Sequence, residues 1–151
     1  MLLFLFLGVL IAISRLKYVG HLTAVAKFLD EQIGNIYLVN VVIGLLSAIV
    51  DNVPLVAASM GMYPVVSPEL LETFSPENAD YYQHFVQDGN FWEFLAYCAG
   101  TGGSALIIGS AAGVAVMGME RIDFIWYLKR MSLLAILGYA AGAICYVLLI
   151  A

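Results

Sequence analysis

Four apolar stretches alternate with polar segments along the chain, and their lengths predict helices of different kinds. Residues 1–14 predict the end of a spanning helix, because about 21 Å of helix falls short of a 30 Å hydrocarbon core. Residues 15–32 mix charges with apolar side chains at helical spacing, which is typical of an amphipathic helix in the membrane interface. Residues 131–150 have the length of an ordinary spanning helix.

The two middle apolar stretches are too long for one straight crossing, and each is interrupted. Residues 35–63 would make about 43 Å of helix but contain Asp51-Asn52-Val53-Pro54, where Pro54 removes a backbone donor and disfavours helix before it. Residues 91–118 contain Gly100-Thr101-Gly102-Gly103-Ser104. Both patterns predict helices that break at membrane depth, the second as a discontinuous spanning helix.

The segments between these stretches are polar. Residues 64–90 hold five acidic residues and three prolines, which predicts an aqueous loop that is partly helical. Residues 120–130 are a short charged connection with Trp126 and Tyr127, whose rings suit the headgroup region. Two small-xxx-small spacings, Gly109 to Gly113 and Gly138 to Gly142, indicate close helix packing.

The amino-acid composition indicates that the chain is surrounded by lipid. Hydrophobic residues make up 63% and charged residues 11% of the 151, and the mean hydropathy is +0.95, which indicates an all-α integral membrane protein in contact with the bilayer. The net charge is -5, and residues 28–120 contain no Lys or Arg, so no nucleic-acid partner is expected. Cys98 and Cys145 have no partner at a metal-ligand spacing, which argues against a disulfide framework or a zinc site, and no cofactor is expected.

Helix breaks at membrane depth have a chemical meaning. An unsatisfied backbone group in hydrocarbon costs several kcal/mol, so non-helical backbone there must be buried in protein or line a polar cavity. The two breaks also bring side-chain oxygens, which suit a hard cation. The residues that carry those oxygens are Ser47, Asp51, Asn52, Thr101 and Ser104. The residues expected to break the helical backbone are Pro54, Gly100, Gly102 and Gly103. A carboxyl such as Asp51 is expensive in a membrane and can hold a proton or a cation in turn.

Simpler interpretations stay open at this stage. Asp51 or Asn52 could cap the helix that begins near Pro54, at the water interface and without an ion. The glycines at 100–104 could form a closely packed kink, whereas a nucleotide loop is disfavoured because they do not fit G-x-G-x-x-G. His21 and His84 are expected to be solvated.

The segments "GLLSAIVDNVPLVAASMGMYP" and "NFWEFLAYCAGTGGSALIIGSAAGVAVMGMERIDFIWYLKR" closely resemble the C-terminal part of NhaD-type sodium/proton antiporters, of the ion transporter superfamily. The resemblance covers nearly the whole chain. It implies one repeat of an inverted-repeat transporter, with residues 15–32 as interfacial helix, residues 35–63 as re-entrant hairpin and residues 91–118 as broken transmembrane helix. It also implies that Asp51, Asn52 and Thr101 bind transported sodium or lithium, with Ser47 and Ser104 nearby, in exchange for protons.

Such transporters are two to three times longer than this chain, so a missing N-terminal repeat, a partner chain or a homo-oligomer is expected to complete the site. The resemblance also implies the bacterial inner (cytoplasmic) membrane, with Arg121, Lys129 and Arg130 cytoplasmic and residues 64–90 and the C-terminus outside. Two alternatives remain: half of a sodium-coupled anion transporter, or a non-transporting membrane subunit or fragment. None of these is an enzyme.

Overall fold

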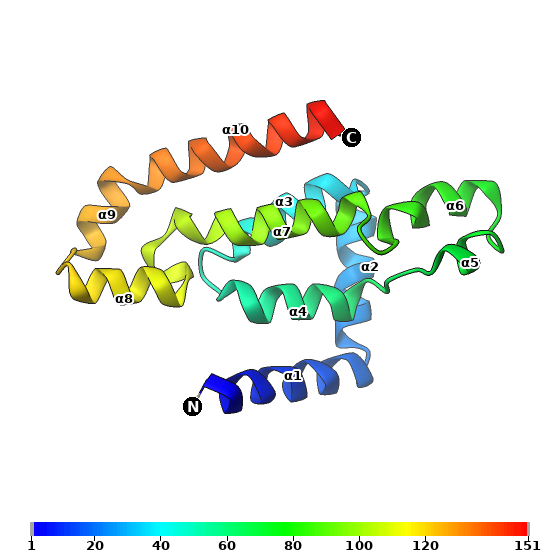
Figure 1. Ribbon diagram of the computed structural model, residues 1–151, viewed down its shortest axis with the longest axis horizontal. Helices are drawn as coiled ribbons and strands as arrows, with labels where there is room; N and C mark the ends of the chain where they lie inside the picture. Colours follow the sequence, from blue (N-terminus) through cyan, green and yellow to red (C-terminus); the bar gives the residue numbers. More distant parts are fainter. Residues whose placement is uncertain (1, 151) are drawn as a thin grey trace.

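A computed structural model describes residues 2–150, and every element named in this part of the chain is a helix (Figure 1). The all-α architecture predicted from the sequence is therefore confirmed for these residues. Met1 and Ala151, the outer ends of the expected ranges, lie outside the described residues.

The first two helices meet at a sharp bend. Helix α1 (Leu2–Tyr18) and helix α2 (His21–Ile33) are bent by 71° relative to each other. Gly20, between them, has a φ of 83°, a left-handed conformation that favours glycine. The boundary expected after residue 14 moves to Tyr18, because α1 continues through Arg15 and Lys17, whose positive charges suit the carbonyl end of a helix. Helix α2 stands across the bundle (Figure 1).

Residues 35–63 fold into two short helices that run in opposite directions along the long axis (Figure 1). These are α3 (Ile36–Leu46), whose first amides are capped by the Asn35 side chain, and α4 (Asn52–Met62). The break begins at Ser47, earlier than the expected Asp51-Asn52-Val53-Pro54. Pro54 lies in the first turn of α4, where a helix has no partner for the missing N–H, so proline starts this helix rather than ending the previous one.

Residues 90–119 form a helix in two halves. Helix α7 (Asn90–Gly102) is followed by two 3-10 turns, η2 (Gly103–Ala105) and η3 (Ile107–Gly109), and then by α8 (Ala111–Met119), which continues in the same direction along the long axis (Figure 1). The break lies later than expected from the sequence. Gly100 and Thr101 are still helical, whereas Leu106 and Ser110 are extended.

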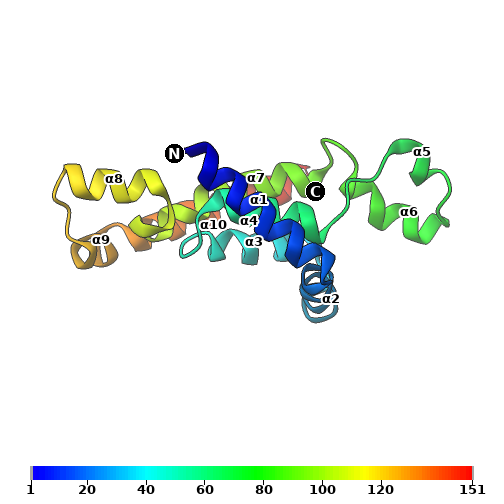
Figure 2. The same ribbon diagram turned by 90° about the horizontal axis from the view of Figure 1, so that it is seen from below.

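The polar segments lie at opposite ends of the elongated molecule (Figures 1 and 2). At one end the acidic loop forms α5 (Pro68–Leu71), α6 (Pro76–Tyr82) and η1 (Gln83–Phe85). The base of this loop is closed by a β-bridge between Val66 and Val86, with the Val66 amide donating to the Phe85 carbonyl at 2.9 Å. At the other end lies α9 (Phe124–Arg130), with Lys129 and Arg130 in its last turn.

Helix α10 (Ser132–Ile150) is, among the described residues, a single unbroken helix long and apolar enough to cross a membrane. It packs on α7 through tyrosines: Tyr97 donates a hydrogen bond to the Tyr139 carbonyl at 3.0 Å, and the Tyr139 hydroxyl donates to the Val41 carbonyl on α3 at 2.9 Å. A Cβ on Gly142 would overlap the Tyr97 phenol, whereas Gly138 has open space. The close contact of this small-xxx-small pair is therefore made by Gly142.

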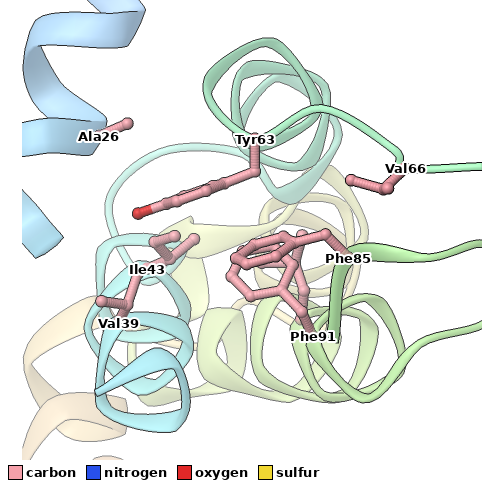
Figure 3. Packing of buried hydrophobic residues seen from close by; sticks show 8 residues of the cluster. Ala26, Val39, Ile43, Tyr63, Val66, Phe85 and Phe91 are labelled. Carbon is pink, nitrogen blue, oxygen red and sulfur yellow. The ribbon is translucent and has the colours of Figure 1, made fainter. Parts of the chain in front are cut away.

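The tightest helix pairing is α3 with α7, and it holds a buried polar group. Asn40 is fully buried and donates to the Phe91 carbonyl at 3.0 Å. Next to it the largest aromatic cluster joins Phe91 to Phe85 and Tyr63, so the ends of α4, α7 and the loop share one core (Figure 3). This core fixes the hairpin at its open end, away from its tip.

Candidate ion site

The hairpin tip, residues 47–51, is a turn with unpaired carbonyls. Ser47 is fully buried, and its hydroxyl donates to the Gly44 carbonyl at 2.6 Å. Within the described chain, the carbonyls of residues 47–50 accept no backbone hydrogen bond. The residue four positions after Val50 is Pro54, which has no N–H to offer. The tip therefore presents backbone oxygens that a cation or a water molecule could use.

The broken part of the α7–α8 helix, residues 103–110, packs directly on this tip through glycines. A Cβ on Gly102 would overlap the Gly44 carbonyl oxygen and lie 2.9 Å from the Ser47 hydroxyl oxygen. A Cβ on Gly109 would lie 2.7 Å from the Ser47 carbonyl oxygen, and one on Gly103 would lie 3.4 Å from it. The distances at Gly102 and Gly109 leave no room for a side chain, and the one at Gly103 leaves little, so glycine allows the two interrupted backbones to meet.

Asp51 and Asn52 stand at the start of α4 and are both half-buried. Asp51 occupies the N-cap position, but its carboxylate accepts no hydrogen bond from the α4 amides. Asp51 is thus at the position of a helix cap, but it does not make the hydrogen bond that defines one. Asn52 lines an otherwise apolar groove of about 460 Å³ between α1, α4 and α7, in which Gly100 also lies.

Thr101 and Ser104 occupy different surroundings. The Thr101 hydroxyl donates to the Tyr97 carbonyl at 2.7 Å within α7, which leaves its oxygen lone pairs available. Ser104 is exposed, and its carbonyl accepts from the Tyr127 hydroxyl at 2.9 Å. Ser104 and Gly103 line a second groove of about 280 Å³ beside α8. The structure therefore does not bring the expected oxygens into one groove: Asn52 lines the first and Ser104 the second, and neither groove is lined by Ser47, Asp51 or Thr101.

Three residues at this junction were not singled out as site residues from the sequence. Gly44 is the point on α3 where α7 and the Tyr139 hydroxyl approach most closely. Ser110 caps α8 by accepting a hydrogen bond from the Gly113 amide at 3.0 Å. Gly109 was recognised only as part of a small-xxx-small pair, and that spacing was the available signal.

The described residues contain no group of three or more His, Cys, Asp or Glu side chains that could hold a metal ion. Cys98 is buried and Cys145 exposed, and both are free thiols.

Comparison with known proteins identifies the relatives of the chain, although no family model and no solved structure matches it. It is 50% identical over 141 residues to Sodium/proton antiporter 1 of Arabidopsis thaliana, covering 93% of this chain and 22% of that protein. For Sodium/proton antiporter 2 of the same plant the identity is 45%, and the alignment covers 93% of this chain and 30% of the relative. The Na(+)/H(+) antiporter NhaD of Vibrio cholerae is 34% identical over 146 residues, which are 95% of this chain and 26% of that protein.

The chain thus spans less than a third of the length of these relatives. Their names support a membrane protein. Because two of them come from a plant and one from a bacterium, the bacterial inner membrane stays a prediction. The resemblance found in the sequence is confirmed: over nearly its whole length this chain is related to part of the NhaD-type sodium/proton antiporters, a family of membrane transporters and not of enzymes.

Proposed function

We propose that this chain is part of a secondary transporter that exchanges sodium or lithium for protons, with Asp51 as the site that holds either ion. The observation that supports this most is the meeting of two non-helical segments, residues 47–51 and 103–110, inside an apolar helical protein. Such backbone is tolerated at membrane depth where it is covered by protein or lines a polar cavity. Broken helices of this kind bind ions in secondary transporters.

The chemistry follows from the groups at the tip. The unpaired carbonyls of residues 47–50 and the Asn52 amide oxygen are neutral ligands of the kind that hard cations accept. The Thr101 hydroxyl can add its lone pairs while it keeps its hydrogen bond to Tyr97. Ser104 would join after a shift of the broken segment toward the tip. Asp51 supplies the negative charge, and since one carboxylate cannot hold a proton and a cation together, binding of one ion releases the other.

The remaining part of the site comes from elsewhere, because this chain spans 22–30% of the plant relatives. We propose that a second inverted repeat, on the same or a partner chain, covers the groove lined by Asn52. In this arrangement α9, with Lys129 and Arg130, faces the cytoplasm, and the acidic loop faces outside. Sodium would then meet negatively charged side chains before it reaches the tip.

The test compares two substitutions of aspartate by asparagine in the full-length protein that contains this segment. Everted membrane vesicles are loaded with a pH-sensitive dye, and proton release on adding sodium is measured. Asp51→Asn is expected to abolish exchange, because the amide cannot take up a proton or balance a cation. Asp88→Asn is the matched control: Asp88 is exposed in the loop with a φ of 59°, a conformation that asparagine also adopts.

Intact sodium-dependent proton release in Asp51→Asn would overturn the assignment of Asp51. Sodium uptake that requires an added dicarboxylate and moves no protons would instead support the sodium-coupled anion alternative. Expressing the 151-residue chain alone and together with the remainder of the protein shows which parts are needed. Exchange by the chain alone would favour a homo-oligomer, and exchange only with the remainder would favour a second repeat.

A further inference from the structure

Tyr63, at the end of the hairpin, connects more elements than any residue of the tip. It is the C-cap residue of α4 and is 4% exposed. Its ring stacks on Phe85 at a centroid distance of 5.3 Å and lies against Phe91 of α7 at 4.8 Å. Figure 3 shows the ring reaching past Ile43 of α3, with its oxygen directed toward α2.

The hydroxyl of Tyr63 is held by a carboxylate of α2, which is called the arm from here on. It donates a hydrogen bond to Asp30 Oδ1 at 3.0 Å, and Asp30 lies in the last turn of α2. Asp30 and Tyr63 line a groove of about 170 Å³ together with Lys27 of the arm and Tyr81 and Tyr82 of the loop. One half-buried carboxylate thus connects the arm to the hairpin next to the acidic loop.

Helix α4 carries this connection to the ion site. It has 11 residues, about 16 Å, with Asp51 at its N-cap position and Tyr63 at its C-cap position. The two halves of the hairpin also have different neighbours: α3 packs on α7, whereas α4 packs mainly on α1 and α2. The arm is therefore one of the two main neighbours of α4, and this short helix connects Tyr63 to Asp51.

We propose that Asp30 is a positioning residue that, through its hydrogen bond to Tyr63, holds α4 so that Asp51 and Asn52 stay in place at the hairpin tip. The transport test of this inference rests on the proposed function, whereas the cysteine-labelling test described below does not. Asp30 touches no transported ion in this role. Its effect is on how often the hairpin is in the geometry that binds sodium.

The transport test uses the full-length protein and three variants at the connection. Tyr63→Phe and Asp30→Ala are each expected to raise the sodium concentration for half-maximal exchange about tenfold, as expected for one hydrogen bond to a charged group. The double variant should do no more than either single one, because both remove the same bond. Asp30→Asn, which keeps an acceptor oxygen, should restore most of the affinity.

Tyr82→Phe is the matched control, since Tyr82 lines the same groove and shows no hydrogen bond to Asp30 in the structure. The proposal would be overturned if Tyr63→Phe and Asp30→Ala lowered the amount of folded protein but left the sodium affinity unchanged. It would also be overturned if their effects were additive in the double variant. In either case the hydrogen bond would serve stability alone. The affinity readout therefore distinguishes positioning from stability.

A second measurement does not depend on transport. Val53, exposed on α4 next to Asn52, is replaced by cysteine in a Cys145→Ser background, and its reaction with a water-soluble maleimide is followed. Tyr63→Phe should change the labelling rate about tenfold, and Tyr82→Phe should leave it unchanged. An unchanged rate in Tyr63→Phe would overturn the positioning role. A wild-type protein without sodium-dependent exchange, but with this change in labelling, would overturn the proposed function alone.

Discussion

Alanine at position 102 should separate the hairpin tip from the broken helix, whereas alanine at position 100 should not. Both glycines lie in α7, two residues apart, and both have helical backbone. A Cβ on Gly102 would overlap the Gly44 carbonyl, but one on Gly100 would meet nothing within 4 Å. The pair of variants therefore differs in this one contact.

The magnitude follows from two opposing terms. Replacing glycine by alanine within a helix stabilises it by about 0.5–1 kcal/mol, and both variants share this gain. Forcing an extra carbon into a packed site costs about 1–3 kcal/mol, and only Gly102→Ala has this cost. Since the shared gain cancels in the comparison, Gly102→Ala should be less stable than Gly100→Ala by about 1–3 kcal/mol.

The assay is thermal unfolding of the purified full-length variants in detergent, together with sodium-dependent proton release in vesicles. Gly102→Ala should unfold at a lower temperature than Gly100→Ala and should bind sodium more weakly, because the tip is pushed away from the break. Equal unfolding temperatures and equal sodium affinities for the two variants would refute the close contact between α3 and α7 on which the site is built.

Two further outcomes concern the cap of α8 and a tyrosine of the acidic loop. Ser110→Ala removes the cap of α8 and should cost about 1 kcal/mol in thermal unfolding, whereas Ser75→Ala, at an N-cap whose side chain makes no cap bond, should cost much less; equal losses would contradict the capping role. Burial, and then the negative charge of Asp30, raise the pKa of Tyr81 from its ordinary value of 10.0 to about 12. The folded-state pKa is above the unfolded one, so the stabilisation is complete below pH 10 and is lost between pH 10 and about 12. The phenolate absorbance change near pH 12 should therefore be smaller in Tyr81→Phe than in the wild type, and a loss of amplitude near pH 10 instead would contradict this assignment.

The sequence was sufficient to predict the apolar helices in their order, because long apolar runs, prolines and glycine clusters are strong local signals, but it predicted residues 120–130 only as a charged connection where the structure has α9. It predicted that residues 35–63 and 91–118 are each interrupted, and the structure shows both interruptions. It placed both breaks a few residues away from their observed positions. Pro54 was interpreted as breaking a helix, with a helix that begins near Pro54 as the simpler alternative, and the structure shows a helix beginning there.

The contacts at the candidate site could not be predicted from the sequence, because they join residues that are far apart along the chain. Gly44 and Gly102 are far apart along the chain, and one glycine among many in an apolar segment gives no sign that another backbone will approach it. The same holds for Asp30 and Tyr63, whose hydrogen bond depends on the 71° bend after α1. Local patterns predict elements, whereas the angles between elements decide which polar groups meet.

The β-bridge between Val66 and Val86 makes the acidic loop an excursion whose two ends are tied together at its base. Exposed tips with such fixed ends are the places where proteins tolerate insertions and deletions, because a change in length there does not pull on the rest of the chain. Residues 72–75, between α5 and α6, can therefore lengthen, shorten or change charge while the hairpin and the broken helix keep their register. In the proposed transporter, the charge of this loop can thus change in evolution independently of the groups at the hairpin tip.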